Sequence, residues 1–499
     1  MTYTVKPWID GAFVDGKGGT KDIDNPATGK VVGTLELVSH DQLIAAIDSA
    51  ARAQREWAEA SAPRRQNVFY TFRQLVLEHM DELAQHSVRE HGKTVSDARG
   101  EIKRGLETVE YACGIGANMK GEHSLHVGSS VDLTTFRQPV GVVAGIVPFN
   151  FPAMVPMWMF PLALATGNAF VLKPSNQVPS AVVAMAPLLK EAGLPDGLFQ
   201  VLPQGHDETA AMIDHPAVQA VSFVGSTSIA RIIRDQAVKT DTRVQALGGA
   251  NNHAIVMPDA DRDFVAKQLA AAAFGAAGER CMALPIAVAV GKAGDGLADA
   301  VAEQAKKIAK VGEGNDPEAG FGPVISQKAK DRIVAWIDEA EKRGARVVLD
   351  GRNATVEGYE GGYWLGPTIV ENVPHDCKLY CEEVFGPVLV IEKEDSYRDA
   401  IALVNSSDVG NGAAIFTNDG GWARRFELDV EAGMVGINVP IPTPVAYYSF
   451  GGWKDSLIGE HHIHGPEGVE FYTRAKAVTK RWPTDSGHYE ATMSFEKED

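Results

Sequence analysis

The sequence is poor in cysteine and has no excess of positive charge. Only four of its 499 residues are cysteines, too few for a disulfide framework, so we expect a protein of a reducing compartment, the cytoplasm. Cys377 and Cys381 stand four residues apart without a second pair, so we predict no zinc site and no other bound metal. The formal net charge of −18 argues against a nucleic-acid partner, which would require a basic surface.

Signals for membrane targeting or anchoring are also lacking. The first residues contain neither the apolar core of a signal peptide nor an Arg- and Ser-rich transit pattern. Residues 138–172 carry no charge and are numerous enough to cross a bilayer, but they include five prolines and two asparagines. Because proline disrupts the interior of a helix, we interpret this stretch as buried strand, turn and packed helix, and we predict no membrane contact.

The hydrophobic pattern alternates between strands and helices over most of the chain. A chain of 499 residues is too long for one hydrophobic core, so we expect two or three domains. Apolar runs typical of buried strands alternate with helical patterns, which indicates a parallel, doubly wound α/β sheet with ligands at the carboxyl ends of its strands. The predicted strands are residues 140–147, 169–173, 199–202 and 220–224, with a helix at 180–192.

After Gly249 the pattern begins again and predicts a second α/β domain. Here we expect a helix at 261–277, a strand at 286–290 and a helix at 297–310. Polar and apolar residues alternate, as in an exposed strand, at 121–137 and, near the C-terminus, at 468–473 and 475–480. Lone β-ribbons are marginally stable in water, so we expect these segments to pair with each other or with another subunit.

Cys281 has the most informative setting of the four cysteines, within the sequence GERCMA at 278–283. A small, uncharged stretch precedes it, and the guanidinium of Arg280 beside it favours the thiolate, which is a strong nucleophile. Free cysteines are also among the most buried residue types, so this hexapeptide alone leaves a structural role equally open.

Six motifs follow one another in a fixed order along the chain. They are PFNFP (148–152), KPS (173–175), FVGST (223–227), LGG (247–249), GERC (278–281) and EEVFGP (382–387). In this order they resemble the NAD(P)-dependent aldehyde dehydrogenase superfamily over essentially the whole chain. Within it, the sequence is most similar to the CoA-acylating branch of methylmalonate-semialdehyde dehydrogenases, through RCMA (280–283), NHAIVMPDA (252–260), GMVGINVPIP (433–442) and SFGGWK (449–454).

The resemblance implies three structural parts. A Rossmann-like, doubly wound, dinucleotide-binding domain would comprise residues 1–120 and 138–247. A second α/β domain, carrying the nucleophilic cysteine, would comprise residues 248–448. A β-ribbon arm of residues 121–137 and 466–490 would join subunits into a homo-oligomer, a dimer or a homotetramer.

The resemblance also assigns catalytic roles. Cys281 would attack the carbon of an aldehyde to form a thiohemiacetal, while Asn150 and the backbone N–H of Cys281 stabilise the developing oxyanion. Hydride would then pass to NAD and leave a thioester on the cysteine. Without the resemblance, Asn150 would be interpreted as a turn residue between two prolines.

Eight residues are implied in binding NAD. Lys173 would contact the adenosine ribose, and Gly225 and Ser226 open a helix whose N-terminus favours a pyrophosphate. Glu383 and Phe385 would hold the nicotinamide ribose and ring. Three further residues of the same motifs complete the set: Phe149, Ser175 and Asn176. Without the resemblance, Lys173 would be an ordinary lysine at a strand end and Gly225 and Ser226 a common helix start. Glu383 and Phe385 would lie at the edge of a surface strand.

Asn176 and Ala246 depart from the pattern of the superfamily. Many NAD-preferring relatives have glutamate at the position of Asn176, which repels the 2′-phosphate of NADP, so NADP stays an alternative to NAD. Most members have a glutamate base in place of Ala246, which activates water to hydrolyse the thioester. Alanine cannot accept a proton, and loss of a general base typically slows a step by about 10²- to 10⁴-fold.

The acyl group is therefore expected to leave with a thiol, coenzyme A, because a thiol ionises slightly at neutral pH without help. The alternative is a hydrolytic dehydrogenase that releases a free acid, with Glu279 or Glu383 supplying the missing base. A second alternative is a non-catalytic protein that uses the same scaffold. The cluster His461, His462 and His464 is interpreted as a solvated loop and not as a metal site.

Two arginines would make a cationic pocket for an anionic substrate. Arg280 adjoins the nucleophile, and Arg104 lies in a helical pattern that resembles the family segment supplying an arginine for a substrate carboxylate. Pattern alone would leave Arg104 as a solvated arginine near Glu101 or Glu107. The expected substrates are methylmalonate and malonate semialdehyde. The expected products are propionyl-CoA and acetyl-CoA, because a thioester carbonyl stabilises the enolate left by CO2 loss.

Overall fold

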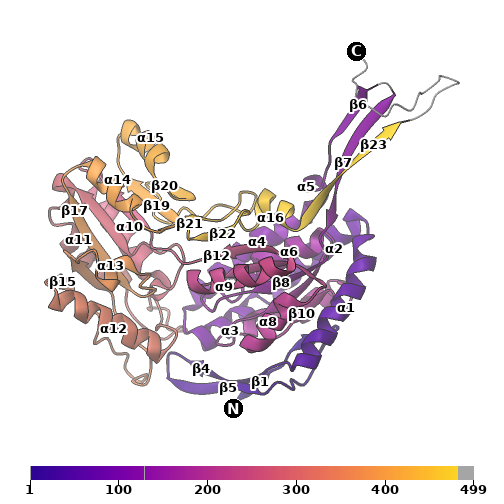
Figure 1. Ribbon diagram of the computed structural model, residues 1–499. Helices are drawn as coiled ribbons and strands as arrows, with labels where there is room; N and C mark the ends of the chain where they lie inside the picture. The colour runs from indigo at the N-terminus through magenta and orange to yellow at the C-terminus, as the bar shows by residue number, and fades with distance from the viewer. Residues whose placement is uncertain (1, 129, 482–499) are drawn as a thin grey trace.

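The computed structural model describes residues 2–128 and 130–481. Two large sheets, each flanked by helices, make up the body, and a narrow ribbon projects from it (Figure 1). Buried apolar side chains gather into two clusters, one around each large sheet. This confirms the predicted α/β fold, in which each layered sheet has its own core.

The first large sheet has eight strands in the order β22-β12-β11-β8-β9-β10-β2-β3. The five central strands run parallel, whereas antiparallel pairs add β22 at one edge and β2 and β3 at the other. The strands are β2 (Trp8–Ile9), β3 (Ala12–Phe13), β8 (Val142–Ile146), β9 (Ala169–Lys173), β10 (Phe199–Val201), β11 (Val218–Val224), β12 (Arg243–Leu247) and β22 (Leu457–Gly459).

Helices cover this sheet. They are α1 (His40–Ala58), α2 (Ala62–Glu78), α3 (Met80–His91), α4 (Val95–Cys113), α5 (Ile115–Asn118), α6 (Met154–Ala165), α7 (Ser180–Glu191), α8 (His206–Asp214), α9 (Thr227–Ala237) and α16 (Gly465–Phe471). Every residue of α6 is buried, as expected for a helix that is apolar on all sides. Within the described ranges, none of the helices combines the length and the apolarity needed to cross a membrane.

The second large sheet has seven strands in the order β15-β16-β17-β14-β13-β19-β20, and only β15 pairs antiparallel. The strands are β13 (His253–Val256), β14 (Ile286–Val290), β15 (Arg346–Leu349), β16 (Thr368–Glu371), β17 (Val388–Glu394), β19 (Gly412–Phe416) and β20 (Met434–Ile437). Its helices are α10 (Arg262–Phe274), α11 (Leu297–Ile308), α12 (Gln327–Lys342), α13 (Lys378–Cys381), α14 (Tyr397–Asn405) and α15 (Gly420–Asp429).

The projecting ribbon is a three-stranded antiparallel sheet of β6 (His123–Gly128), β7 (Val131–Pro139) and β23 (Thr473–Arg481) (Figure 1). The predicted strand at 468–473 is wrong, because α16 occupies it up to Phe471 and packs on α6. Its buried residues Gly465, Gly468 and Val469 have the spacing of a helix, but a segment this short also fits the two-residue period of a strand. The ribbon therefore resumes at Thr473, and residues 482–490 of the predicted arm lie outside the described residues.

Two small sheets complete the fold. One joins β1 (Tyr3–Val5), β5 (Lys30–Glu36) and β4 (Thr20–Asn25) in the order β1-β5-β4, below the body in Figure 1. The turn between β4 and β5 contacts the second half of the chain, because the N–H of Tyr363 donates to the carbonyl oxygen of Pro26 at 2.9 Å. The other pairs β18 (Val409–Gly410) with β21 (Trp453–Lys454).

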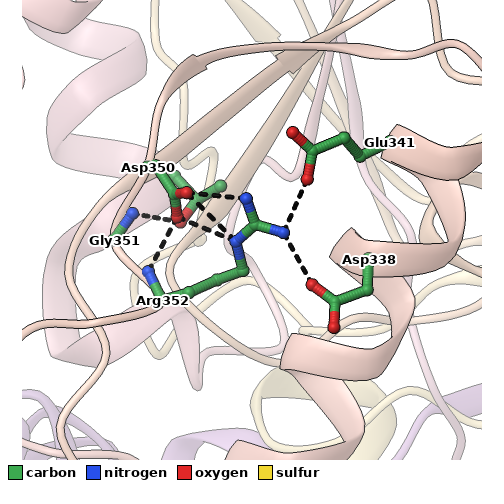
Figure 2. Close-up of polar contacts among 6 residues, drawn as sticks. Asp338, Glu341, Asp350, Gly351 and Arg352 are labelled. Carbon is green, nitrogen blue, oxygen red and sulfur yellow. Dashed lines mark hydrogen bonds and ion pairs between the residues drawn. The ribbon is translucent and has the colours of Figure 1, made fainter.

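Arg352 fastens the segment after β15 to α12 (Figure 2). Its guanidinium lies 2.6 Å from Asp338 and 2.8 Å from Glu341, both on α12, and 2.6 Å from Asp350. These carboxylates raise the pKa of the guanidinium, and the hydrogen bond from Arg352 lowers the pKa of Asp350. One arginine thus bridges three carboxylates and offsets part of their mutual repulsion.

Replacing Arg352 with methionine is expected to lower the free energy of unfolding by about 1–2 kcal/mol, because solvent screens carboxylates that are 39–49% exposed. Thermal melts of the variant and the wild type measure the loss. The stabilisation is present above the pKa of an unfolded aspartate, about 3.9, and is lost as pH falls through the lowered pKa of Asp350. The difference in melting temperature should therefore shrink at acidic pH.

The control for this prediction is Arg424→Met, which removes a single ion pair to Glu427 from a side chain that is 70% exposed. It should leave the melting temperature nearly unchanged. Equal destabilisation by both substitutions would contradict the role given to the Arg352 cluster.

Candidate active site

A tight turn after α10 delivers Cys281 to its position. The predicted helix at 261–277 ends at Phe274, and Ala276 and Ala277 have positive φ angles of 52° and 55°. Positive φ is uncommon outside glycine and concentrates at functional sites. Gly278, with φ of 69°, lies so close to the backbone of Gly386 that a Cβ would stand 2.0 Å from its carbonyl oxygen. Alanine has a high helix propensity, which explains why the sequence pattern predicts a helix that continues past its observed end.

Cys281 lines two cavities. The first has a volume of about 260 Å³ and is lined by residues of α4, α6 and the segment 441–450, together with Arg280 and Cys281. The second is a narrow space between Cys281 and Glu383–Phe385. A third cavity, of about 580 Å³, shares Ala250 and Glu383 with this narrow space. The sulfur is therefore placed between a chamber large enough for a small substrate and a wider crevice.

Burial raises the pKa of the Cys281 thiol to about 12, and the negative charge of Glu383 acts in the same direction. Arg280 opposes this only weakly, because its guanidinium is paired with Asp97 at 2.8 Å. Arg280 favours the thiolate, as predicted, but the burial of the sulfur and the charge of Glu383 outweigh it. The resting thiol carries its proton at neutral pH.

Asn150 reaches the nucleophile segment from the loop after β8. Its Nδ2 donates to the carbonyl oxygen of Glu279 at 2.9 Å, which leaves the second N–H of the amide for a ligand. Lys93 donates to the carbonyl oxygen of Asn150 at 2.6 Å and pairs with the buried carboxylate of Glu101. Glu101 also accepts from the N–H of Ala153 at 2.9 Å. This buried pair fixes the loop that carries Asn150.

Sequence reasoning missed Lys93 altogether and gave Glu101 no role beyond a possible partner of Arg104. It also missed Asn252 and Asn411, whose Nδ2 atoms donate to the carbonyl oxygen of Cys281 at 2.9 and 3.1 Å. A buried lysine is rare, so no sequence signal distinguished Lys93 from a surface lysine. Asn252 did lie in a quoted motif, but without an assigned role.

The two alternative bases are placed differently. Glu279 is buried, accepts from the N–H of Ile325 at 3.0 Å, and has its other oxygen 3.7 Å from Nε2 of His91. Within the described part of the chain, Glu279 lines neither of the two cavities at Cys281, whereas Glu383 lines the narrow one. Burial raises the pKa of Glu383 to about 7. Of the two carboxylates, only Glu383 is therefore brought to the nucleophile.

Both predicted substrate arginines line the 260 Å³ cavity, but each is already engaged. Arg280 is paired with Asp97, which lines the same cavity. Arg104 lies 2.7 Å from Glu107 and donates to the carbonyl oxygens of Thr443 and Pro444 at 3.2 Å. The lining holds two guanidiniums and two carboxylates, Asp97 and Glu101, so a substrate carboxylate would have to share or displace the present partners of the arginines.

The predicted adenosine contacts lie at the carboxyl end of β9. Lys173 donates to the carbonyl oxygen of Pro174 at 3.0 Å, and burial lowers the pKa of its ammonium to about 8, with Lys21 adding to the effect. Ser175 is buried. Asn176 donates from Nδ2 to the carbonyl of Gln204 at 3.0 Å, while its buried Oδ1 has no hydrogen-bond partner within residues 2–128 and 130–481. An orphaned acceptor here fits a ribose hydroxyl.

The predicted pyrophosphate contact lies where Gly225 and Ser226 precede α9. Ser226 stands at the N-cap position, but its side chain makes no capping bond and instead lies 3.3 Å from the hydroxyl of Ser228. The first N–H groups of α9 are therefore left to hold an anion.

The predicted nicotinamide contacts come together from both sheets. Phe149 packs edge-to-face on Phe385 at 5.9 Å between ring centroids. Glu383 lies against Gly249, where a Cβ would stand 2.8 Å from its Oε2. With the orphaned oxygen of Asn176 and the uncapped start of α9, these residues fit a dinucleotide.

Comparisons with known proteins agree with this geometry. The aldehyde dehydrogenase family model matches residues 13–478. A malonate-semialdehyde dehydrogenase of Pseudomonas aeruginosa is 45% identical over 99% of both chains. The crystal structure of a methylmalonate-semialdehyde dehydrogenase from Oceanimonas doudoroffii is 47% identical over 97% of this chain and 99% of its own, with a TM-score of 0.95.

A structure of a putative methylmalonate-semialdehyde dehydrogenase from Sinorhizobium meliloti, complexed with NAD, has the same TM-score of 0.95 at 45% identity, covering 97% of this chain and 99% of its own. A mouse mitochondrial enzyme named methylmalonate-semialdehyde/malonate-semialdehyde dehydrogenase [acylating] is 44% identical over 98% of this chain and 91% of its own. The chain belongs to the aldehyde dehydrogenase family.

Proposed function

We propose that this protein is an NAD-dependent, CoA-acylating dehydrogenase of methylmalonate and malonate semialdehyde. The observation that carries the proposal is the position of Cys281, which lines both an arginine-containing cavity and the narrow space beside Glu383. Guanidiniums suit a substrate that carries a carboxylate beside its aldehyde. The names of the relatives support the same substrates and, for the mouse enzyme, acylation.

In this proposal the thiol of Cys281 first loses its proton to solvent, and the resulting thiolate attacks the aldehyde carbon. Asn150, through its free N–H, and the backbone N–H of Cys281 stabilise the negative charge that develops on the oxygen. NAD, when bound, supplies the acceptor for the hydride, and a thioester remains on Cys281. We assign its binding to Lys173, Asn176, Ser226 and the residues around Glu383, with Gly225, Ser175, Phe149 and Phe385 completing the site.

Loss of CO2 follows from the structure of the thioester. The bond between the carboxylate carbon and the adjacent carbon breaks, and its electron pair enters the thioester as an enolate, which the donors at Asn150 and Cys281 stabilise. A proton then adds to the carbon. Coenzyme A finally displaces Cys281 and releases acetyl-CoA or propionyl-CoA. Ala246, which has no proton-accepting group, leaves this thiol route open while water stays unactivated.

The ribbon supports the proposal of a homo-oligomer, a dimer or tetramer. Leu125, Val127 and Phe136 on its strands are 63%, 53% and 39% exposed, and large exposed apolar side chains favour association. All four cysteines are free thiols, which supports the proposed cytoplasmic location.

Turnover of malonate semialdehyde tests the proposed function. Formation of NADH is followed with and without coenzyme A, and the product is identified by mass. The proposal expects steady turnover only with coenzyme A and acetyl-CoA as the product. Turnover without coenzyme A that yields a free acid would contradict it and would favour the hydrolytic alternative.

Opposite effects on the substrate KM are expected from the two members of the Arg280–Asp97 pair. Arg280→Leu removes a partner of the substrate carboxylate and should raise the KM for malonate semialdehyde by about tenfold or more, the loss of one charged hydrogen bond. Asp97→Asn frees the guanidinium from its competitor at 2.8 Å and should lower this KM. Steady-state kinetics at saturating NAD and coenzyme A measure both.

Propanal, which lacks the carboxylate, is the control substrate for these variants. Its KM should change much less than that of malonate semialdehyde, and Arg104→Leu should behave like Arg280→Leu. Parallel changes with both substrates would contradict a carboxylate-binding role for these arginines.

A further inference from the structure

The 580 Å³ cavity lies between the start of α9 and the second large sheet. Its lining includes Ser226 and Thr227 on one side and Asn251, His253 and Tyr380 on the other. It shares Ala250 and Glu383 with the narrow space at Cys281. A flexible molecule that fills this cavity can therefore extend its end toward the sulfur from the side opposite the substrate cavity.

Two residues of the lining each carry a buried polar atom that has no hydrogen-bond partner within the described ranges, Nε2 of His253 and the hydroxyl of Tyr380. Both residues are buried, with side chains 3% and 7% exposed. Unpaired buried polar groups are rare in folded proteins and cost free energy, so each one calls for a partner. No contact assigned to NAD uses either atom.

The hydrogen-bonding capacity of each atom is fixed by its surroundings. Nδ1 of His253 lies 2.8 Å from the carbonyl oxygen of Asn251, so Nδ1 carries the proton and Nε2 is an acceptor. Burial lowers the pKa of His253 to about 4, which keeps the ring neutral at pH 7. Burial raises the pKa of Tyr380, so its hydroxyl remains a donor. Stacking on His375, at 4.4 Å between centroids, holds the phenol ring.

One acceptor and one donor on neighbouring rings match a secondary amide, which has one N–H and one C=O. The ring centroids of His253 and Tyr380 are 6.2 Å apart in an edge-to-face arrangement. Leu403 and Val409 add aliphatic surface to the lining, and Ser406 adds a hydroxyl group. The cavity therefore suits a neutral chain that contains amides and aliphatic carbon.

Acidic side chains restrict phosphate binding in this cavity to the start of α9, the contact assigned above to the pyrophosphate of NAD. Glu382, Glu383, Asp408 and Asp455 line it. Coenzyme A combines a phosphorylated nucleotide with a neutral pantetheine arm that carries two amides and ends in a thiol. The lining matches the arm and disfavours the nucleotide.

We propose that this cavity binds the pantetheine arm of the acyl-accepting thiol, with Nε2 of His253 and the hydroxyl of Tyr380 bonded to its amide groups. The inference rests on the proposed function, because it requires coenzyme A as acceptor. The thiol sulfur attacks the thioester carbon, a new C–S bond forms and the bond to Sγ of Cys281 breaks. The proton of the incoming thiol ends on Cys281, so the exchange needs no oxidant or reductant.

Tyr380→Phe and His253→Leu test the proposal in the full-length protein. Each should raise the KM for coenzyme A about tenfold, the effect of one lost hydrogen bond. With free pantetheine as the acceptor, the KM for pantetheine should rise by the same factor. With 2-mercaptoethanol, which is too short to reach these groups, the change should be less than about twofold. The NADH burst before thiol is added is the internal reference.

Tyr472→Phe is the matched control, because Tyr472 is fully buried and lies outside the cavity lining. Its KM for coenzyme A should equal that of the wild type. An equal loss with 2-mercaptoethanol, an equal rise in the KM for NAD, or an unchanged KM for coenzyme A in Tyr380→Phe would overturn the proposal. Wild-type turnover without coenzyme A would instead contradict the proposed function before any variant is compared.

Discussion

Replacing Cys281 with alanine is expected to lower the formation of NADH by on the order of 10⁴-fold or more, because no thiohemiacetal can form without a nucleophile. Rapid mixing of the variant with NAD and malonate semialdehyde should show no burst, and the mass of the intact protein should show no acyl adduct. Cys113→Ala is the control, since Cys113 is a buried thiol at the end of α4, outside the site. A burst in the Cys281 variant would contradict covalent catalysis and favour a non-catalytic or non-covalent role.

The pH dependence of the thiol gives the same residue a second, independent signature. Because burial raises the pKa of Cys281 well above neutrality, only a small fraction of the thiol is ionised at pH 7. Alkylation of the cofactor-free protein by iodoacetamide should therefore be slow and should rise tenfold per pH unit between pH 7 and 9.

Glu383→Gln removes the negative charge that helps to raise the pKa of Cys281, so it should speed alkylation at a given pH. A rate that is already independent of pH near neutrality would show that the cysteine rests as a thiolate. That outcome would show that the cation of Arg280 outweighs the burial of the sulfur.

The central strands could be predicted from the sequence because their patterns have one interpretation. Residues 169–173 and 286–290 are short apolar runs, and the structure has β9 and β14 at these bounds. Buried parallel strands read as continuous apolar runs, so neither neighbouring elements nor side-chain contacts were needed to place them.

The errors arise where distant parts of the chain decide the local structure. The alanines at 276 and 277 have high helix propensity, but the contact of Gly278 with the backbone at Gly386 requires a turn. The alternation at 468–473 suggests a strand, but packing on α6 makes it a helix. In both cases tertiary contacts override a pattern of only a few residues.

The candidate site was predictable in its motifs and not in its electrostatics. The resemblance assigned Asn150 to the oxyanion at Cys281 and Glu383 to the nicotinamide ribose. In the structure Asn150 bonds to the carbonyl oxygen of Glu279, and Glu383 lines the narrow space at Cys281. Adjacency in sequence did not reveal that the guanidinium of Arg280 turns toward Asp97, 183 residues away, or that burial dominates the pKa of the thiol. Charges and hydrogen bonds of this kind depend on contacts across the fold, which a single sequence does not contain.

Placing glutamate at position 246 is expected to change the reaction itself. Ala246 is fully buried in β12, between β11 and β22, where it pairs with Phe223 and Ile458. A carboxylate here would stand at the position where most members of the family have their base, so release of free acid without coenzyme A should rise by about 10²-fold or more. The acid is measured by chromatography after incubation with NAD and malonate semialdehyde, with coenzyme A omitted.

Ala246→Gln separates base catalysis from crowding, because glutamine has the same size and cannot accept the proton. Only the glutamate variant should hydrolyse the thioester, and its rate should rise with pH as the new carboxyl ionises. Melting temperatures of both variants show the cost of enlarging a buried side chain. If the glutamine variant hydrolyses the thioester equally well, then packing around Ala246 keeps water from the thioester in the wild type. The missing base would not be the cause. The remaining outcome is that neither variant hydrolyses the thioester faster, while Glu383→Gln abolishes a hydrolysis that is measurable in the wild type. Glu383 is then the base, and the hydrolytic alternative is supported.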